Sequence, residues 1–525
     1  MRKAVAYLFL ILGVLSCTPR GGQLEGGPEV ENPEPEQPPV FETSYDAVAN
    51  MGVGWNLGNT LDSWWVDDTD GRDWKRWETG WGQPVTGPEL MVMMKNAGFG
   101  AIRVPVTWSP HMDKDGNVYE EWMNRVNQIV DYVLDAGMYC IINVHHDTGS
   151  DSKVWLVASE EDYARERDLY EGLWRQIAER FKDYDHRLLF ESYNEMLDEY
   201  GSWCFASMNK GYDQESADES YKAINSYAQS FVDAVRSTGG NNAVRNLIVN
   251  TYGACNGSGN WNPHLKDPLR FMALPSDKAE DHLIFQVHAY PLIDDIPSME
   301  AEVEDMFSSL DLYLAVQGAP VIIGEWGTFS ENPSQENLLH FADFFVRRAK
   351  DYGFGTFYWM TLSDGFARSV PAFSTPELAK TIVEAWHGEG VGVFPDIDDF
   401  DFKYKVTFNS QWSEMNLSPS DFPLDRYVGV RFSLEKAPTA GELHVKIYGD
   451  AEGKEQFGKI SGKDVTVMFD PDIVGTGCRG VTLQYTRTSS YTTTVRDVAM
   501  ICPDGSLEKV VPSVYWGCYV EPVAI

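Results

Sequence analysis

The sequence has little positive charge for its length. Over 525 residues, 42 lysines and arginines stand against 79 aspartates and glutamates, and the formal net charge is −37. A surface this acidic repels a phosphate backbone, so we do not expect nucleic acid as a partner. A neutral polymer such as a glycan meets no such barrier, and the acidity then serves solubility.

Long apolar runs are missing after the first residues, which leaves no later segment able to span a bilayer as a helix. Spacings typical of metal sites are missing too: the 7 cysteines contain no CxxC pair, and the histidines form no HxH or HExxH motif. His145 and His146 are adjacent on an expected strand, so we expect them to point to opposite sides, which makes a poor chelate. The sequence therefore predicts neither a metal nor a cofactor.

The first residues are typical of an exported lipoprotein. Arg2-Lys3 and the apolar stretch 4–15 match the charged and hydrophobic regions of a signal peptide, which we assign to residues 1–16. Leu15-Ser16-Cys17 resembles a bacterial lipobox, in which Cys17 is lipidated and becomes the mature N-terminus. We expect a protein anchored by this lipid at the outer membrane or cell surface of a bacterium. The sequence leaves open which membrane face carries the anchor.

Export also affects what we expect of residues 17–40 and of the cysteines in the folded part of the chain. Residues 17–40 are rich in proline, glycine and glutamate and have almost nothing to bury, so we expect a semi-extended tether. In an oxidising compartment Cys204 and Cys255 could form a disulfide, and so could two of the three cysteines after residue 470. The sequence does not determine the pairing.

Residues 41–390 alternate short apolar runs with amphipathic stretches at helical spacing. Strands that are apolar on both faces, with a helix between each pair, imply a parallel sheet covered on both sides. Eight such units predict a (β/α)8 TIM barrel. A doubly wound open sheet is the alternative, and the lack of a glycine-rich phosphate motif after the first strand weakens it. The eight runs are 52–57, 101–106, 139–144, 188–193, 247–251, 283–287, 321–324 and 355–359.

The C-terminal part has a different pattern. Residues 391–401 are expected to be a linker, and residues 402–525 alternate in the manner of strands separated by turns, which predicts a small β-sandwich without helices. The strands are expected at 402–408, 428–434, 443–448, 465–469, 481–485 and 492–501. A carbohydrate-binding module, a spacer and a lid over the cleft are all open, because only Trp412 and Trp516 of the 17 tryptophans lie there.

Two glutamates follow strands of the predicted barrel, Glu195 after the fourth and Glu325 after the seventh. The carboxyl ends of barrel strands open onto one face, where barrel enzymes place their chemistry. A facing pair of carboxylates is what glycoside hydrolysis needs. We expect Arg103 and the Tyr290 hydroxyl to lower the pKa of Glu325 and hold it as the anionic nucleophile. Glu195 has fewer cationic neighbours and is expected to be the acid and base.

Other polar residues also stand at strand ends, and one role among them follows from chemistry. Asn194 lies beside Glu195, where it could bind the sugar 2-hydroxyl, an interaction that strengthens in the transition state. The remaining candidates from the strand ends are Arg103, His145, His146, His288, Tyr290 and Trp359.

Six ordered segments carry a resemblance to a known family: residues 54–62 (GWNLGNTLD), 102–108 (IRVPVTW), 143–147 (NVHHD), 193–195 (YNE), 287–290 (VHAY) and 324–327 (GEWG). They are similar to glycoside hydrolase family 5, the cellulase family, over about residues 41–390. The resemblance implies a retaining mechanism with Glu195 as acid/base and Glu325 as nucleophile. It also implies that the strand-end residues surround the cleaved sugar. Met196 departs from the family, in which proline is common at this position.

Substrate is less determined than reaction. The 54–62 segment resembles the endo-β-1,4-glucanase branch, so we expect cleavage of cellulose-type chains, mixed-linkage glucan or xyloglucan by a monomer. A β-mannanase, a non-catalytic glycan-binding surface lipoprotein and a metal-dependent barrel hydrolase are the alternatives. Asn59 and Trp65 are expected to bind substrate. Tryptophans in the same long loop, and others in later loops, either stack on sugar rings or pack against the barrel: Trp64, Trp74, Trp77, Trp81, Trp155, Trp203 and Trp261.

Overall fold

A computed structural model describes residues 41–64, 70–150, 154–399, 402–419, 426–475 and 478–524. The signal peptide, Cys17, the tether and Trp65 lie outside the described residues. Within the described part, none of the helices combines the length and the apolar composition that a bilayer span requires.

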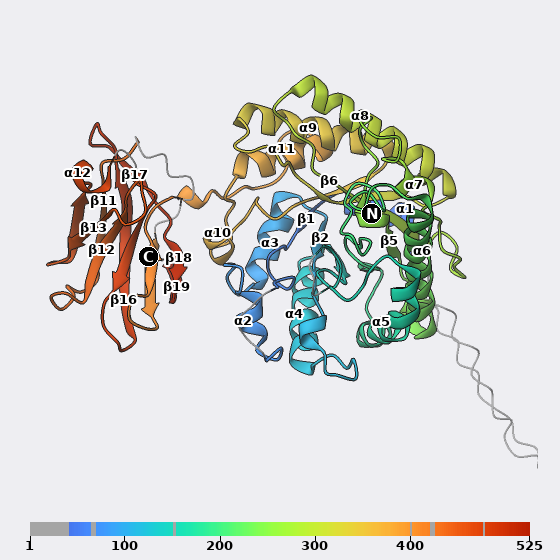
Figure 1. Cartoon of the computed structure of the whole chain (residues 1–525), viewed down its shortest axis with the longest axis horizontal. Coiled ribbons are helices and arrows are strands. Elements are labelled where there is room, and N and C mark those ends of the chain that lie inside the picture. The colour runs from blue at the N-terminus through green and yellow to red at the C-terminus, as the bar shows by residue number, and fades with distance from the viewer. Residues whose placement is uncertain are drawn as a thin grey trace, which may run out of the picture. The chain divides into compact units, whose positions relative to one another are not determined.

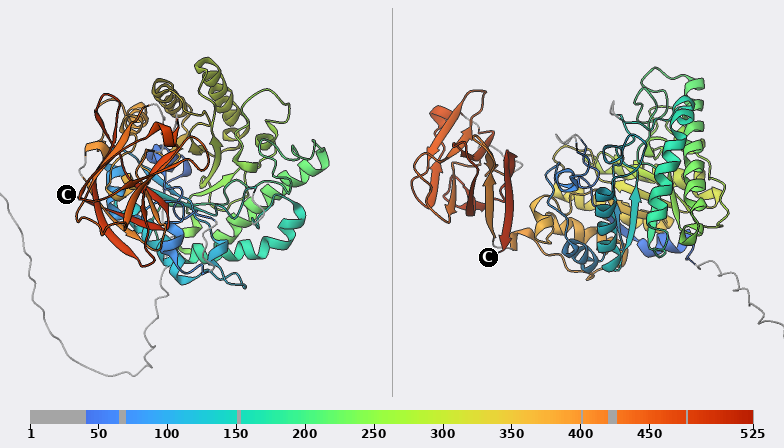
Figure 2. Two further views of the ribbon diagram at one scale, coloured as in Figure 1. Left: turned by 60° about the vertical axis from the view of Figure 1, so that its left-hand side comes forward. Right: turned by 90° about the horizontal axis from the view of Figure 1, so that it is seen from below.

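Eight parallel strands close into a barrel in chain order, as the alternating runs predict, and the helices surround them (Figures 1 and 2). The open-sheet alternative is therefore wrong. Each strand is short and buried along its length, because helices cover the outside and side chains fill the inside. The strands are β1 Val53–Asn56, β2 Ala101–Val104, β3 Tyr139–Asn143, β4 Leu188–Glu191, β5 Leu247–Asn250, β6 Leu283–Ala289, β7 Val321–Trp326 and β8 Gly355–Tyr358.

The helices begin at residues that favour a helix start. Ser159, Asp213 and Ser334 each accept a backbone N–H of the first turn through their side chains, which stabilises α5, α6 and α9. The helices of this part of the chain are α1 Ser44–Met51, α2 Trp74–Glu78, α3 Pro88–Ala97, α4 Glu120–Asp135, α5 Glu160–Arg180, α6 Gln214–Ser237, α7 Asp267–Arg270, α8 Ile296–Tyr313, α9 Gln335–Tyr352, α10 Phe366–Ser369 and α11 Pro376–His387. Short 3-10 turns are η1 Ser109–His111, η2 Gly240–Ala243, η3 Tyr252–Ala254, η4 Ala315–Gln317 and η5 Ile397–Asp399.

The barrel interior changes from apolar to polar along the strands. Its lower layer includes Ile141 and Leu189, which form one buried cluster with Ala47, Val48 and Met51 of α1. Because side chains alternate along a strand, the residue two positions further on faces the interior again. Those positions are polar in several strands and build the floor of the upper opening: Asn56, Arg103, Asn143, Glu191, Asn250, Gln286 and His288.

A β-bulge interrupts β7 at its carboxyl end. Val287 of β6 pairs with Ile323, but the next residue, His288, pairs with Glu325, so Gly324 is the extra residue of β7. Strict alternation would turn Glu325 towards the outer helices, since Ile323 belongs to the outer core. The bulge re-aims Glu325 to the interior, the use to which bulges near active sites are often put.

The C-terminal part is an all-β unit of two antiparallel sheets around its own buried cluster, and its strands are orange to red in Figure 2. The strand orders are β13-β12-β15-β10-β18 and β14-β11-β16-β9-β19, with β17 paired to β16. The six predicted strands are present, but several short ones and a helix were not predicted. The strands are β9 Phe402–Phe408, β10 Glu414–Asn416, β11 Gly429–Leu434, β12 Leu443–Tyr448, β13 Glu455–Lys459, β14 Asp464–Met468, β15 Gly480–Tyr485, β16 Tyr491–Ile501, β17 Leu507–Lys509, β18 Ser513–Trp516 and β19 Cys518–Ala524, and the helix is α12 Pro471–Val474.

The segment predicted as a linker is partly attached to the barrel. Val393 donates its N–H to Asn96 O at 3.1 Å, and the N–H of Phe373 donates to Pro395 O at 2.8 Å. Residues up to about 397 therefore have backbone partners, and residues 400 and 401 lie outside the described residues. The boundary at residue 390 stays a prediction.

Candidate active site

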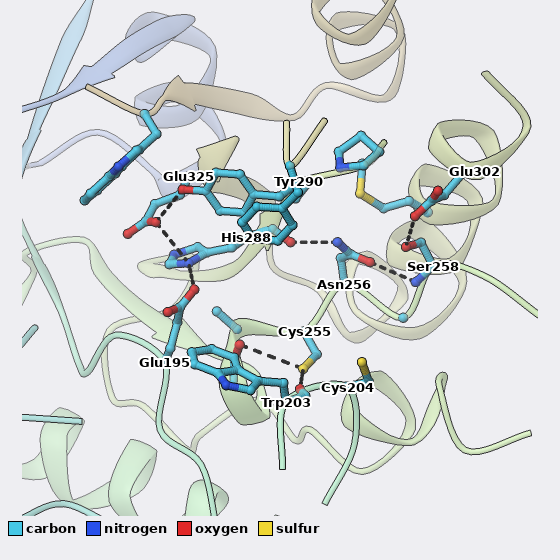
Figure 3. Close-up of a pocket in the computed structure, with 18 of the residues that line it drawn as sticks. Glu195, Trp203, Cys204, Cys255, Asn256, Ser258, His288, Tyr290, Glu302 and Glu325 are labelled. Carbon is cyan, nitrogen blue, oxygen red and sulfur yellow. Dashed lines mark hydrogen bonds and ion pairs between the residues drawn. The ribbon is translucent and has the colours of Figure 1, made fainter. Parts of the chain in front are cut away.

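Glu195 and Glu325 face each other at the carboxyl end of the barrel, with His288 between them (Figure 3). His288 Nδ1 lies 2.8 Å from Glu195 Oε1 and 3.5 Å from Glu325 Oε2. One carboxylate oxygen of each glutamate and a ring nitrogen of His288 all lie within 4.8 Å of one another. The bulge in β7 makes this meeting possible, because it turns the Glu325 side chain inward.

Glu325 is held by two donors from below and beside it. Arg103 donates from its terminal guanidinium nitrogen at 2.6 Å, and the Tyr290 hydroxyl donates at 2.8 Å. The expectation that its pKa is lowered is wrong in net direction. Burial raises the pKa of Glu325, and the positive charge of Arg103 and the Tyr290 hydrogen bond oppose that effect only in part. The same donors nevertheless hold the carboxylate in place, one at each oxygen.

Glu195 is less buried than Glu325 and has fewer hydrogen-bond donors around it. Among the described contacts its carboxylate meets only the His288 ring, and its side chain is 22% exposed. Burial raises the pKa of Glu195 to about 7, and the opposing effects of His146 and Arg103 do not cancel that rise. A carboxyl group with this pKa is protonated in a large fraction of molecules near neutral pH. It can therefore donate a proton and take one back.

Arg103 is clamped between two acids, one of which the sequence reasoning missed. Its guanidinium makes two hydrogen bonds to Glu191, at 2.6 and 2.7 Å, and one to Asn194 Oδ1 at 2.9 Å. Burial raises the pKa of Glu191, but the Arg103 charge together with the hydrogen bonds from Arg103 and Asn143 outweighs this effect, and the net shift is downward. A charged residue inside an otherwise apolar strand, as in Leu188-Leu189-Phe190-Glu191, is the signal that could have found it, because a buried charge needs a partner.

Amides complete this buried layer. Asn143 Nδ2 donates to Glu191 at 3.0 Å, and Asn56 accepts from Arg103 at 3.0 Å while donating to the Gly324 carbonyl at 2.9 Å. These amides were not among the predicted site residues. Their effect is to hold Arg103 and the bulged backbone in one arrangement, so that Glu325 has a fixed position.

His288 and Tyr290 stay uncharged in this setting. Burial lowers the pKa of His288 to about 4, so the ring is neutral near neutral pH. Burial and the neighbouring Glu325 raise the pKa of Tyr290 well above its ordinary value, so the phenol remains a hydrogen-bond donor. Within the part of the chain that the structure describes, the arginine that forms an ion pair with one of the two glutamates is Arg103, and its partner is Glu325.

His145 and His146 lie side by side instead of on opposite sides. β3 ends at Asn143, so strand alternation does not apply to them, and their rings meet edge to face with centroids 4.5 Å apart. The reason given for a poor chelate is therefore wrong. Together with Asp62 they offer ligand atoms within 4.8 Å of one another. Both Asp62 oxygens already accept backbone N–H groups, from Asn59 at 3.0 Å and from Thr60 at 2.6 Å, and we assign no cation there.

Trp359 forms an aromatic wall beside these histidines. Its ring is parallel to that of His145, with centroids 6.1 Å apart. Gly58 lies directly behind the indole, where a Cβ atom would come within 2.8 Å of it. A glycine is needed at this position for the ring to lie flat against the backbone.

A cavity of about 810 Å³ opens above the glutamates. It contains most of the predicted site residues: His145, His146, Asn194, Glu195, His288, Tyr290, Glu325 and Trp359. Arg103 lies beneath it. Asn59 is not among the lining residues, and its backbone holds Asp62 instead.

Aromatic side chains from separate loops line the cavity. Trp203, Trp261 and Phe329 line it and are 41%, 64% and 72% exposed, and Phe329 stacks on Tyr290 with centroids 4.9 Å apart. Phe329 was not predicted, although an aromatic residue directly after the 324–327 segment was a usable signal. In the other loop the packing alternative holds for Trp64 and Trp77, which are buried.

Two thiols lie beside Trp203 (Figure 3). Cys204 and Cys255 both line the cavity and are free, as are the other cysteines among the described residues. The Cys255 thiol donates to the Trp203 carbonyl at 2.7 Å, which ties the β5 loop to the β4 loop (Figure 3). Burial raises the pKa of Cys255 well above its ordinary value, so this thiol is a packing group and not a nucleophile.

Comparison with protein families identifies this constellation. A family model described as Cellulase (glycosyl hydrolase family 5) matches residues 66–365, more than half of the chain. Endoglucanase A of Clostridium longisporum is 33% identical over 344 residues, which is 62% of this chain and 61% of that protein. Endoglucanase B of Ruminococcus albus is 31% identical over 362 residues, 65% of this chain and 80% of that protein. The chain thus spans about three fifths of the first of these relatives.

Solved structures agree in fold. A GH5-4 broad specificity endoglucanase from an uncultured bacterium superposes with a TM-score of 0.63 at 53% identity, over 66% of this chain and 97% of that one. A family 5 glycoside hydrolase from Prevotella bryantii B14, solved with a xyloglucan tetradecasaccharide, has a TM-score of 0.60 at 41% identity, over 66% of this chain and 99% of that one. In each comparison the matched part is about two thirds of this chain.

Proposed function

The chain belongs to glycosyl hydrolase family 5, and on that premise we propose that it is a retaining endo-β-1,4-glucanase. The observation that carries the proposal is the separation of the two carboxylates, whose oxygens lie within 4.8 Å of each other. Carboxyl groups about 5 Å apart leave no room for a water between the second carboxylate and the anomeric carbon, and are typical of retaining enzymes. Inverting enzymes need roughly 6.5–9.5 Å.

In the first step Glu325 attacks the anomeric carbon while Glu195 gives its proton to the departing glycosidic oxygen. The bond from the anomeric carbon to that oxygen breaks, and an ester between sugar and Glu325 forms. Arg103 and Tyr290 hold the attacking carboxylate, at 2.6 and 2.8 Å, in the required orientation. The raised pKa of Glu195, about 7, supplies the proton.

In the second step Glu195, now ionised, takes a proton from water. The resulting hydroxide attacks the anomeric carbon from the side that the leaving group vacated, and the ester bond to Glu325 breaks. Two inversions restore the original anomeric configuration. Asn194, whose Oδ1 accepts from Arg103 at 2.9 Å, has its amide N–H free to be aimed at the sugar 2-hydroxyl.

The relatives support a glucan as substrate. The named neighbours are endoglucanases, and one family 5 structure holds a xyloglucan oligosaccharide. A lichenase from Caldicellulosiruptor sp. F32, 26% identical over 69% of this chain, was solved with cellotetraose. We therefore propose β-1,4-linked glucan backbones, including mixed-linkage glucan and xyloglucan. The wide cavity and the exposed aromatic side chains that line it suit a glucan chain that carries side groups. β-Mannan is the competing substrate.

The decisive variant is Glu195→Gln, which keeps the shape of the side chain and removes the proton donor. We expect release of reducing sugar from barley β-glucan to fall by at least about 100-fold, while affinity electrophoresis in the same glucan still retards the protein. Undiminished hydrolysis would reject Glu195 as the acid. Proton NMR of the first product must show the retained anomer. If more reducing sugar is released from mannan than from glucan, β-mannan becomes the assigned substrate.

We also propose that the protein is exported and anchored through lipid on Cys17, and that it acts as a monomer. The support is the sequence of residues 1–17, which lie outside the described structure. Radiolabelled palmitate should enter the wild-type protein and the membrane fraction, and Cys17→Ser should lose both. Labelling of the variant would contradict the proposal. Light scattering at the concentration used in the assays should give the molecular mass of a single chain.

A further inference from the structure

The five-stranded sheet of the C-terminal unit has an outward face with an unusual composition. Alternation in β12 buries Leu443, Val445 and Ile447, so His444, Lys446 and Tyr448 lie on the other face. Pairing extends this face across the whole sheet. Residues paired across the five strands, read in the order β13-β12-β15-β10-β18, form rows on this face. One row consists of Lys459, His444, Gln484, Glu414 and Trp516. The next row consists of Phe457, Lys446, Thr482, Asn416 and Ser513.

Aromatic rings stand at both edges of this face and near its middle. Phe457 on β13 is 50% exposed, and Tyr515 and Trp516 on β18 are 56% and 55% exposed. Tyr448 lies between the edges, with its ring centroid 5.8 Å from that of Tyr515. A register shift in β18 at the pairing with Glu414 and Met415 places both Tyr515 and Trp516 near the face.

Between the rings lies a fixed set of polar groups. Glu414 is only 5% exposed and accepts hydrogen bonds from Tyr448 at 2.6 Å, from Thr482 at 2.7 Å, and from Gln484. Lys446 Nζ lies 3.8 Å from the same carboxylate and 4.4 Å from the Tyr448 ring centroid. The solvent face of a sandwich does not need a buried carboxylate for stability, because burying a charge is costly.

From this arrangement we propose that the outward face of the five-stranded sheet is a second binding site for the β-glucan chain, separate from the cleft of the barrel. Exposed aromatic plates suit the apolar faces of pyranose rings, and the exposed polar residues of the same two rows, Lys459 and Ser513, suit the sugar hydroxyls, while the buried cluster around Glu414 holds Tyr448 in place. The identity of the glycan rests on the proposed function of the barrel. A protein partner fits less well, because the centres of protein interfaces are depleted of charged residues, whereas here Glu414 and Lys446 occupy the centre.

The test uses the full chain with the double substitution Tyr515→Ala and Trp516→Ala. Both side chains are more than half exposed, so folding is not at risk. The matched control is Tyr519→Ala, an exposed aromatic residue on β19 of the other sheet. All proteins carry Glu195→Gln, so that the ligand is not consumed and the contribution of the barrel cleft to binding is the same in each protein. The quantity measured is retention on insoluble β-glucan.

We expect the double variant to lose about tenfold in affinity for the insoluble glucan, since truncating an aromatic anchor removes more than 1 kcal/mol, and the control to bind as its parent does. Equal retention of all three proteins overturns the proposal. Hydrogen exchange gives a second reading: residues 443–448 and 513–516 should be protected when barley β-glucan is added, and unchanged exchange there also overturns it.

The test separates this site from the proposed function. In chains with Glu195 intact, the double variant should cleave soluble cellotetraose as fast as the wild type does. If the wild type cleaves no β-glucan, the proposed function fails whatever the sheet binds. If cleavage is intact and retention is unaffected by the double substitution, only the second site fails.

Discussion

Arg103 shows how a single buried cation organises the chemistry. It bridges Glu191 and Glu325, and its own side chain is fully buried. Leaving a buried carboxylate unpaired costs several kcal/mol, so the arginine and the two acids stabilise one another only in this geometry. Glu191 keeps the guanidinium in place, and the guanidinium in turn holds Glu325. Glu195 is outside this clamp, so among the described contacts no hydrogen bond from Arg103 opposes the effect of burial on its pKa.

That difference predicts a bell-shaped dependence of kcat/KM on pH. Glu195 must be protonated to act as the acid, so activity falls as the pH rises through its pKa of about 7. Glu325 must be ionised to attack, and because burial raises its pKa, the acidic limb should lie above the ordinary value for glutamate. Initial rates on a soluble glucan between pH 4 and 9 measure both limbs. A profile that is flat from pH 6 to 9 would contradict the assignment of Glu195.

The same pKa predicts a stability effect for Glu195→Gln. In the unfolded chain the carboxyl titrates near its ordinary value of 4.5, whereas in the folded chain it titrates at about 7. Between these values the folded state holds a proton that the unfolded state does not, so the free energy of unfolding falls as the pH rises through this window. Above this pH window the folded state bears the full free-energy cost of a buried, ionised Glu195.

Glutamine carries no charge and avoids that penalty. We expect the variant to be more stable than the wild type at pH 8 by about 2–3 kcal/mol and equally stable at pH 4, as measured by urea unfolding. Glu89→Gln, at an exposed position on α3, is the control and should change stability little at either pH. Destabilisation by Glu195→Gln at pH 8 would show that the carboxylate is not under desolvation strain.

At the scale of elements, the bulge in β7 decides where the nucleophile points. Gly324 is the inserted residue, and a Cβ atom there would lie 2.2 Å from the Gln286 side chain. Any larger residue therefore pushes against β6 or straightens the bulge. Either movement displaces Glu325, which is the next residue, from Arg103 and Tyr290.

Gly324→Ala should accordingly reduce kcat by at least about tenfold and lower the melting temperature, because overpacking costs roughly 1–3 kcal/mol. Gly355→Ala on the neighbouring strand β8 is the matched control, since its Cβ atom would meet nothing closer than 3.3 Å. We expect the control to keep most of its activity on soluble glucan. Equal losses in both variants would mean that glycine is needed in these strands for reasons other than the bulge.

At the scale of the whole molecule, the reaction belongs to one part of the chain. All described residues that line the cavity lie between His145 and Trp359, and the fully buried core of the C-terminal unit is made of residues 404–518. The two parts have separate hydrophobic cores. We infer that hydrolysis of a small soluble substrate does not require the sandwich.

Residues 41–399 expressed alone should therefore cleave cellotetraose with kcat/KM within about twofold of the full chain. The truncation keeps residues up to 399 because Val393 and Pro395 hydrogen-bond to the barrel. Circular dichroism verifies that the fragment is folded. A folded fragment with strongly reduced activity on cellotetraose would show that the sandwich contributes to the cleft.

The sequence by itself determined the order of strands, the barrel and the pair of glutamates. Hydrophobic periodicity is local, and each strand end carries its polar residue in the sequence, so both can be read without coordinates. The segment Leu188-Leu189-Phe190-Glu191 also held the signal for a buried acid, which was missed because its partner, Arg103, is 88 positions away.

Only the tertiary structure decided where these side chains point and what charge they carry. The two-residue periodicity of a strand in the sequence does not reveal that Gly324 is an inserted residue. This insertion alone turns the Glu325 side chain inward. His145 and His146 meet because β3 ends before them. Burial of Glu325 raises its pKa, and nearby positive charge lowers it. The net pKa is set only in the folded barrel, where eight strands that are distant in sequence surround Arg103.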